Sequence, residues 1–366
     1  FYLMRQNKYY FCKAFCKAYN MNSRQHITFI VNPISGTHNK HIILQLIDEL
    51  IDKERYTYIV RGTEYAGHAS LLAEEAVRKH TDIVVAIGGD GTINEVGRSL
   101  VHTNTSMGII PCGSGNGLAR HLHIPLDPKK AIDILNKGFI KKIDYGIIDN
   151  HPFFCTCGVG FDAFVSLKFA DSGKRGLATY LENTLRESLT YKPETYIIEN
   201  SSGTVSYKAF LIACANASQY GNNAYIAPQA SLTDGMMDVT ILEPFTVLDV
   251  PALSFQLFNK TIDQNSRIKT MKDKSIIIHR ESKGVFHFDG DPIMGGKDLK
   301  VEIIQGGLNV VAPETPRNTT EPFSLLQHFT DFVGQRPISS LIAARHKQFL
   351  QLNQNLLRQL SNKKKG

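Results

Sequence analysis

The sequence predicts an α/β protein in which an N-terminal parallel α/β domain is followed by a mostly antiparallel β-sandwich domain. In the first part of the chain, short β-branched runs alternate with segments of helical apolar spacing, which is the pattern of a parallel sheet with crossover helices. Beyond Lys137 this alternation stops, and short strand-like runs separated by polar turns follow. A length of 366 residues also favours two domains over a single core.

The first domain is predicted to contain four parallel strands. Compact apolar runs mark them at residues 27–31, 56–60, 83–87 and 107–110. Apolar residues recur with helical spacing over residues 42–51 and 69–77, and a third helical segment follows the third strand. Parallel strands end at one edge of a sheet, so we expect the polar residues that follow them to converge on one crevice: Asn32, Thr63, Gly89 and Ser114.

The stretch DIVVAIGGDGTINE, residues 82–95, reads as a strand, a tight glycine loop and a helix. Glycines let a backbone approach an anion, and the N–H groups at a helix start supply a positive field. Asp90 in this loop would repel a phosphate unless a metal ion or a hydroxyl to be deprotonated lies between them, so it is a candidate mechanistic residue. In the alternative interpretation Asp90 only caps the helix. A second glycine-rich loop, residues 111–117, ends the fourth strand and favours an anion site over two plain turns.

The second domain is predicted to contain seven strands, at residues 153–157, 195–199, 209–213, 237–242, 275–279, 285–288 and 299–304. One helix interrupts them over residues 177–189, and its apolar stripe is either core or the wall of a lipid pocket.

The two ends of the chain are predicted to lie outside these domains. Residues 314–366 read as a polar linker and a helical tail with a basic end, which is expected to pack back on the first domain or to lie on a membrane. Residues 1–23 are expected to be an extension outside the fold.

Composition narrows the function classes. The net charge is +7, part of it at the two ends, and no interleaving of aromatic and basic residues suggests nucleic acid. Six cysteines without paired CxxC spacing give no zinc motif and favour free thiols in a reducing cytosol. No run of about 18 apolar residues predicts a transmembrane helix, so we expect a cytoplasmic protein with peripheral membrane contact. Because the chain does not begin with methionine, the sequence leaves open whether a segment precedes it.

Seven short motifs follow one another along residues 26–313: Asn32-Pro33 with Ser35-Gly36, Gly88 to Glu95, Gly113 to Asn116, Asp144 to Gly146, Gly158 to Asp162, Thr233 to Gly235 and Phe288 to Asp291. In this order they resemble the diacylglycerol kinase catalytic family, which includes bacterial lipid kinases, sphingosine kinases and ceramide kinases. The GGDG motif alone is shared with NAD kinases and phosphofructokinases, so the whole set makes the resemblance specific.

The resemblance implies a nucleotide-binding domain over residues 24–145 and a lipid-binding sandwich over residues 146–313, with ATP and lipid meeting between them. It implies that ATP contacts the positions Asn32, Thr63, Gly88, Gly89, Asp90, Gly91, Thr92, Ile93, Asn94 and Ser114. It also implies ligands for Mg²⁺, namely Asp144 through water, and Asp234 with backbone carbonyls near Ser231 and Met236. From the residues alone, Asp144 and Asp234 could each be only a turn residue.

The proton acceptor is where the sequence departs from the family it resembles. Bacterial relatives usually carry glutamate at the position of Asp291, where it is proposed to take the proton of the lipid hydroxyl. Aspartate keeps the carboxylate but is one methylene shorter, so the substrate would sit closer or use a bridging water. Asp90 is the rival, because the corresponding aspartate in the sphingosine kinase branch is also discussed as a base. Asp162 either orients a loop or touches the lipid head group.

The predicted function is transfer of the γ-phosphoryl group of ATP, with Mg²⁺, to the hydroxyl of a lipid such as diacylglycerol or a sphingoid base. One alternative is NAD-kinase-like phosphorylation of a soluble substrate, and another is a nucleotide- or lipid-binding protein without catalysis. The sequence does not identify the lipid, because acyl pockets are built from interchangeable apolar side chains. It also leaves the oligomeric state open, with a homodimer among the options.

Overall fold

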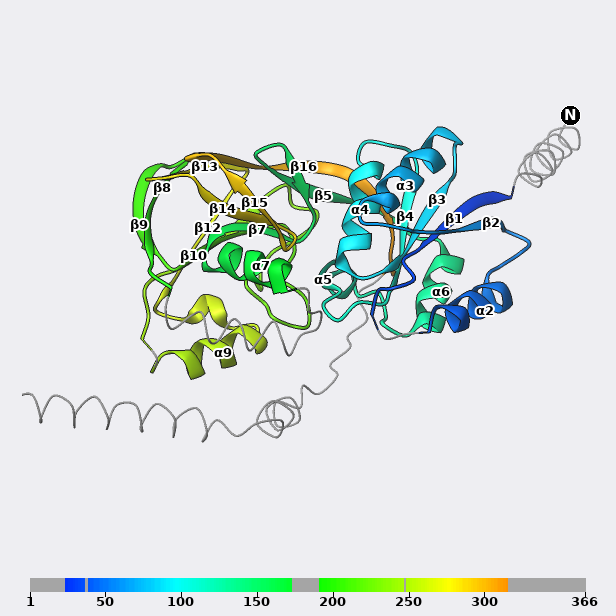
Figure 1. Ribbon diagram of the computed structural model, residues 1–366, viewed down its shortest axis with the longest axis horizontal. Helices are drawn as coiled ribbons and strands as arrows, with labels where there is room; N and C mark the ends of the chain where they lie inside the picture. Colours follow the sequence, from blue (N-terminus) through cyan, green and yellow to red (C-terminus); the bar gives the residue numbers. More distant parts are fainter. Residues whose placement is uncertain (1–23, 37–38, 173–190, 247, 315–366) are drawn as a thin grey trace, which may run out of the picture. The chain divides into compact units, whose positions relative to one another are not determined.

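Four parallel strands form the first part of the fold, in the order β2, β1, β3, β4 (Figure 1). Their bounds are Gln25–Val31 for β1, Tyr56–Gly62 for β2, Ile83–Gly88 for β3 and Ser106–Pro111 for β4. The computed structural model describes residues 24–36, 39–172, 191–246 and 248–314. Every residue of β3 and β4 is buried, which is why both strands lack polar alternation in the sequence.

Helices connect these strands and cover the sheet. They are α2 (Lys40–Leu50), α3 (His68–Arg78), α4 (Asp90–Leu100), α5 (Gly117–His121) and α6 (Pro128–Lys137). Helix α3 packs beside α4, and α2 packs beside α6. The side chains of Asn39 and Asp127 accept backbone hydrogen bonds at the starts of α2 and α6, so both helices begin at residues suited to that position.

The second part of the fold is the predicted β-sandwich. One face is a six-stranded antiparallel sheet in the order β12, β11, β10, β7, β14, β15. Its strands are β7 (Thr156–Gly160), β10 (Leu211–Ala215), β11 (Met237–Leu242), β12 (Ile268–Asp273), β14 (Gly284–Phe288) and β15 (Asp291–Gly295). The other face contains β8 (Glu194–Asn200), β9 (Gly203–Ala209) and β13 (Ser275–Arg280). Side chains from both faces form one buried cluster, which includes Val159, Ile212, Ile198 and Ile278.

One long strand joins the two parts. Strand β16 (Asp298–Val311) pairs with β13 in the sandwich and with β4 in the parallel sheet, and β5 (Ile140–Ile148) lies along it. Strand β6 (His151–Phe153) pairs with β5. The result is a ten-stranded sheet, so the two predicted domains share one hydrogen-bond ladder. The register shifts between Ile304 and Leu308, where Gly306 has a φ of +61°, and the strand continues beyond its predicted end at residue 304.

The strand predicted at residues 153–157 is wrong as a continuous element. The chain there ends β6, bends, and begins β7 at Thr156. The carboxylate of Asp289 accepts the N–H groups of residues 154–156, so these groups are not available to a strand ladder. Strands β9 and β12 were not predicted because neither forms a compact apolar run: one of the seven residues of β9 is buried, and two of the six residues of β12.

Among the described residues of the second part of the chain there are three further helical elements: α7 (Phe161–Ser172), α9 (Val250–Phe258) and a short 3₁₀ turn at Ile262–Gln264. The predictions for residues 1–23, for the helix at residues 177–189 and for the tail after Glu314 fall outside the described residues. Among the helices that are described, none is long and apolar enough to cross a bilayer.

Candidate active site

The carboxyl ends of the four parallel strands carry the residues that were predicted to converge. Asn32 follows β1, and its Nδ2 donates a hydrogen bond to Oγ1 of Thr92 at 3.1 Å. Thr63 follows β2, the neighbour of β1. Gly89 follows β3, and the exposed Ser114 lies in the loop after β4. The strand order therefore places these four positions at one edge of the sheet.

Two glycine loops meet backbone to backbone at this edge. A Cβ on Gly113 would lie 2.7 Å from the Cα of Gly89, so only glycine lets the second loop approach the first this closely. A Cβ on Gly88 would lie 2.5 Å from the side chain of Thr92, while Gly91 has open space where a Cβ would stand. The peptide groups of the first loop are therefore close to the second loop and accessible at Gly91.

The first glycine loop leads into the N-terminus of α4. Gly89 is the residue before this helix and offers no side-chain hydrogen bond to it, so the amides of Gly91 and Thr92 in the first turn are the candidates for contact with an anion. Ile93 and Asn94 are buried, and Ile93 belongs to the hydrophobic core. The N–H of Ile93 donates to the carbonyl of Gly89 at 3.1 Å, so the predicted ATP contact of Ile93 has neither a free N–H nor an exposed side chain behind it.

Asp90 connects the two glycine loops. Its Oδ2 accepts a hydrogen bond from the N–H of Asn116 at 2.8 Å, and its Oδ1 accepts one from the N–H of Gly117 at 2.7 Å. A Cβ on Gly115 would lie 2.7 Å from Oδ2, so the loop has no room for a larger residue there. Burial raises the pKa of Asp90, although the two backbone donors oppose the shift. The carboxylate thus holds the second loop, which neither interpretation from the sequence included.

Glu95, the last residue of the GGDGTINE run, holds the segment that follows Thr63. Its Oε1 accepts the N–H of Gly67 at 2.9 Å, and its Oε2 accepts the N–H of Ala69 at 3.1 Å. Gly67 precedes α3 with a φ of +87° and has no side chain of its own to cap that helix. Glu95 therefore supplies the cap from α4, a role that its place in the run did not reveal.

Asp291, the predicted proton acceptor, starts β15 and meets Arg98 of α4. The distance between Arg98 Nη2 and Asp291 Oδ2 is 3.2 Å, and the Asp291 side chain is 55% exposed. The Arg98 guanidinium also lies 4.7 Å from the ring centre of Phe288 and donates from Nε to the carbonyl of Pro152 at 3.3 Å. Arg98 was not predicted, because its partner stands 193 residues further along the chain.

Asp289, two residues earlier, is a second carboxylate in the same turn. It accepts the N–H groups of Phe154, Cys155 and Thr156 at 2.8, 2.7 and 3.1 Å. Burial raises its pKa to about 6, against the effect of these three donors and of Arg98. Asp289 therefore fixes the turn to the segment between β6 and β7, and its carboxylate is occupied by peptide groups.

Asp144 is buried and joins two segments of backbone. Its Oδ2 accepts the N–H of Gly235 and its Oδ1 accepts the N–H of Gly306, both at 2.7 Å. These contacts tie the turn that contains Asp234 to the irregular part of β16. Each oxygen keeps a second lone pair, so the role predicted for Asp144, hydrogen bonding to a metal-bound water, is compatible with this geometry.

Asp234 already has a cation beside it. Its Oδ2 lies 3.1 Å from Nζ of Lys272, and the same ammonium lies 3.1 Å from Oδ2 of Asp238. Burial lowers the pKa of Lys272, but the two carboxylates more than offset it and raise the pKa overall. Carboxylate and carbonyl oxygens suit Mg²⁺, yet an ion bound here would have to displace Lys272. The described residues contain no cluster of three or more His, Cys, Asp or Glu around one position, and the ligand set Asp144, Ser231, Asp234 and Met236 stays a prediction.

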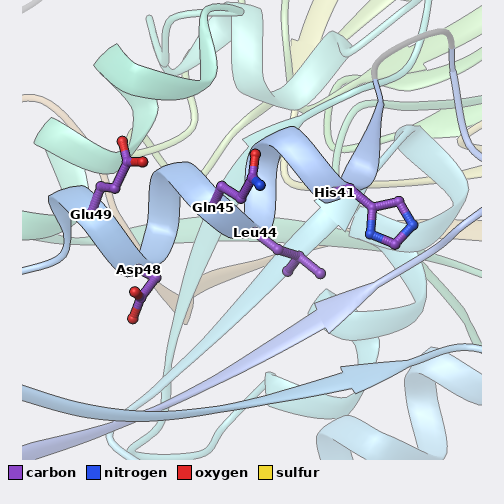
Figure 2. Close-up of a pocket in the computed structure, with 5 residues that line it drawn as sticks. All are labelled: His41, Leu44, Gln45, Asp48 and Glu49. Atoms are coloured by element: carbon purple, nitrogen blue, oxygen red, sulfur yellow. The ribbon is translucent and has the colours of Figure 1, made fainter.

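A surface pocket lies apart from these loops. Figure 2 shows that His41, Leu44, Gln45, Asp48 and Glu49 line it, all on helix α2. Asp48 is engaged by Lys53 at 2.9 Å and by the hydroxyl of Tyr58 at 2.8 Å. None of the residues predicted to carry chemistry lines this pocket, so the candidate site is the edge that carries the two glycine loops.

Family comparisons cover both parts of the fold. Residues 26–148 match the family model described as "Diacylglycerol kinase catalytic domain", and residues 155–312 match "YegS C-terminal NAD kinase beta sandwich-like domain". This pair of domains, with two glycine loops at one sheet edge, defines an enzyme of the kinase class. The chain belongs to the diacylglycerol kinase catalytic family.

Bacterial proteins of this family are similar to the chain over most of their length. Identity to the "Probable lipid kinase YegS-like" of Pectobacterium atrosepticum is 27% over 268 residues, which cover 71% of this chain and 88% of that protein. The protein of the same name from Yersinia enterocolitica is 28% identical over 267 residues, with the same two coverages of 71% and 88%. A solved diacylglycerol kinase from Bacillus anthracis matches with a TM-score of 0.64 at 20% identity, over 80% of this chain and 98% of that chain, which shows the same fold.

Proposed function

We propose that this protein is a lipid kinase that transfers the γ-phosphoryl group of ATP to the hydroxyl of a lipid such as diacylglycerol or a sphingoid base. One observation carries the proposal. The pairing of Arg98 with Asp291 puts a solvent-accessible carboxylate of the sandwich against the helix that begins at the first glycine loop. Arg98 stands in the last turn of α4, so the carboxylate meets the helix at the end away from the loop. An exposed carboxylate on the helix that starts at a phosphate-binding loop suits removal of a proton from an acceptor hydroxyl.

ATP would bind through backbone amides at the edge of the parallel sheet. The amides of the two glycine loops would hold its phosphates, with Asn32, Thr63 and Ser114 around them. Magnesium would enter as part of the substrate, MgATP, and would neutralise charge on the phosphate oxygens. Phosphoryl transfer needs alignment and charge neutralisation more than covalent help from the protein, and rigid backbone loops are suited to supply alignment.

In the proposed step, the lipid hydroxyl oxygen forms a bond to the γ-phosphorus as the bond from that phosphorus to the bridging oxygen breaks. ADP leaves, and the hydroxyl proton passes to the carboxylate of Asp291. Arg98 holds this carboxylate in place at 3.2 Å. Because the side chain is largely exposed, an acceptor hydroxyl can approach the oxygen that Arg98 does not engage.

The contacts of the two candidate bases favour Asp291 over Asp90. Both oxygens of Asp90 accept short hydrogen bonds from backbone N–H groups of the second loop, whereas within the described residues the Asp291 side chain pairs with Arg98 alone. Taking a proton at Asp90 would therefore weaken the link between the two glycine loops. We assign Asp90 to loop geometry and Asp291 to proton transfer.

The lipid acceptor and the membrane contact are part of the same proposal. Relatives in Pectobacterium and Yersinia are named as lipid kinases, which supports a lipid as the acceptor. A long-chain lipid has to be taken from a bilayer, so we propose that a cytoplasmic protein binds the membrane surface peripherally.

The test is a phosphoryl-transfer assay with labelled MgATP and a panel of acceptors: diacylglycerol, monoacylglycerol, sphingosine, ceramide and undecaprenol in mixed micelles, with NAD as the soluble comparison. We expect at least one labelled lipid phosphate and no labelled NAD. Labelling of NAD without any lipid would overturn the proposal in favour of a soluble acceptor, and ATP binding without transfer to any acceptor would overturn it in favour of a non-catalytic protein.

A further inference from the structure

A buried polar cluster lies behind the turn that carries Asp291, and no step proposed above uses it. Oδ2 of Asp162, an acid in the first turn of α7, lies 3.1 Å from Nε2 of His287 and accepts the hydroxyl of Tyr220 at 3.3 Å. Its Oδ1 accepts the N–H of Ala163 at 2.8 Å. Asp162 is 6% exposed and His287 is 2% exposed. Burying a polar group lowers the stability of the fold unless the group is hydrogen-bonded, so the mutual pairing of Asp162 and His287 offsets the cost of burying them.

The neighbours of His287 select one tautomer of its ring. A carboxylate only accepts hydrogen bonds, so Nε2, which faces Asp162, carries the ring proton. Nδ1 is then an acceptor, and the N–H of Gly290 donates to it at 3.4 Å. The ring of a neutral His287 thus connects the carboxylate of Asp162 to a backbone N–H of the turn.

Gly290 is the second central residue of the turn that presents Asp291. Phe288 and Asp291 pair across β14 and β15, so Asp289 and Gly290 form a two-residue hairpin loop. Their φ values of +52° and +88° are those of a type I′ turn. The Asp289 carboxylate holds one side of the turn through three backbone N–H groups, and His287 holds the other side at Gly290.

We propose that Asp162 and His287 form a positioning relay that fixes the Asp289–Gly290 turn and thereby the direction in which Asp291 presents its carboxylate. This inference rests on the proposed function and adds two residues to its machinery. Asp162 accepts the hydrogen bond from the N–H at Nε2 and so fixes the tautomer of His287. In this tautomer Nδ1 is an acceptor, and the hydrogen bond from the N–H of Gly290 to Nδ1 requires it. A displacement of about 1 Å at a reacting group can lower a rate roughly 100-fold, so the relay has a measurable effect on turnover.

Asp162→Asn is the sharpest perturbation, because it reverses the tautomer at nearly constant volume. The N–H of Ala163 needs an acceptor at Oδ1, so asparagine places its oxygen there and its NH₂ group where Oδ2 stood. That NH₂ group then donates to Nε2 of His287, the ring proton moves to Nδ1, and two N–H groups face each other between His287 and Gly290. The substitution therefore acts on the turn without touching it.

The matched control is Tyr220→Phe. It removes a hydrogen bond to the same oxygen of Asp162 but gives the carboxylate no proton, so the tautomer of His287 is kept. His287→Gln is a second test variant, since it keeps a donor toward Asp162 and removes the acceptor for Gly290.

The experiment uses NMR and kinetics on the wild type and these variants. NMR gives the ¹⁵N shifts that report the tautomer of His287 and the amide shifts of Gly290 and Asp291. Kinetics gives kcat and the KM for ATP with the lipid identified in the acceptor assay. We expect wild-type Nδ1 to be unprotonated. In D162N we expect Nδ1 to be protonated, the two amide shifts to move, and kcat to fall roughly 10- to 100-fold at an unchanged KM for ATP. H287Q should lose kcat to a similar extent, and Y220F should stay within about twofold of the wild type.

Three outcomes would overturn the relay: a proton on Nδ1 in the wild type, a reversed tautomer in D162N without loss of kcat, or equal losses in D162N and Y220F, which would mean that any lost hydrogen bond in the cluster has the same effect. If the wild type labels no lipid, the proposed function fails. The tautomer and amide shifts then still decide whether Asp162 controls the turn.

Discussion

Replacing Asp90 with asparagine removes one acceptor from the junction of the two glycine loops. The two oxygens of Asp90 receive the N–H groups of Asn116 and Gly117 at 2.8 and 2.7 Å, and asparagine can accept only one of them. Its NH₂ group then faces the other N–H at hydrogen-bond distance. A donor left without an acceptor in a buried position costs about 1–3 kcal/mol, and this cost falls on the geometry of the second loop.

This free-energy cost sets the expected loss of ATP affinity. If the loop has to be held for the phosphates to bind, about 1–3 kcal/mol corresponds to a KM for ATP roughly 5- to 150-fold higher, because every 1.4 kcal/mol is a factor of ten. The assay is initial rate against ATP concentration, together with ATP binding by calorimetry. Asp82→Asn is the control, because Asp82 accepts a backbone N–H at 2.7 Å before β3, at the opposite end of that strand. If D90N binds ATP like the wild type and loses only kcat, the loop-holding role is refuted and Asp90 becomes the base.

Three further predictions concern the other contacts. Because burial raises the pKa of Asp289 to about 6, the folded state binds its proton more tightly than the unfolded chain, and the free energy of unfolding should fall by about 3 kcal/mol as pH rises from about 3 to about 7. Urea unfolding should show this fall relative to D289N, and equal pH slopes would contradict it. Added Mg²⁺ should raise the midpoint of thermal unfolding more in Lys272→Met than in the wild type, because the Lys272 ammonium competes for the carboxylates of Asp234 and Asp238; an equal rise in both proteins would be the opposite result. Gly113→Ala should weaken ATP binding roughly tenfold by calorimetry, because its Cβ would lie 2.7 Å from the Cα of Gly89 and overpacking costs about 1–3 kcal/mol; an unchanged affinity would show that the loops can separate freely.

The parallel part of the fold could be predicted from sequence because its signals are local. Strands such as β3 are buried on both faces and read as unbroken apolar runs, and the helices between them keep a regular apolar stripe. The path of β16 could not be predicted, because its partners β4, β5 and β13 come from separate parts of the chain. Strand β5 carries Lys141, Lys142 and Asp144 among its residues, so its composition resembled a polar connection.

The glycine loops of the candidate site could also be predicted, since glycine at close-contact positions leaves a visible pattern. The side chains that fix those loops could not, because a carboxylate that accepts backbone N–H groups looks like any other surface acid in a sequence. Asp289 and Phe154 are 135 residues apart, and Arg98 and Asp291 are 193 residues apart. Tertiary contacts at such separations have no spacing rule that a single sequence displays.

The most direct test of the central claim compares wild type, D291N and D291E in lipid phosphorylation at saturating MgATP, with ATP affinity measured in parallel. If Asp291 takes the proton, D291N should lose roughly 10²- to 10⁴-fold in kcat with unchanged ATP affinity, since the side chain is exposed and holds no backbone. D291E, which restores the longer carboxylate, should keep most of the activity. Full turnover by D291N would contradict the account.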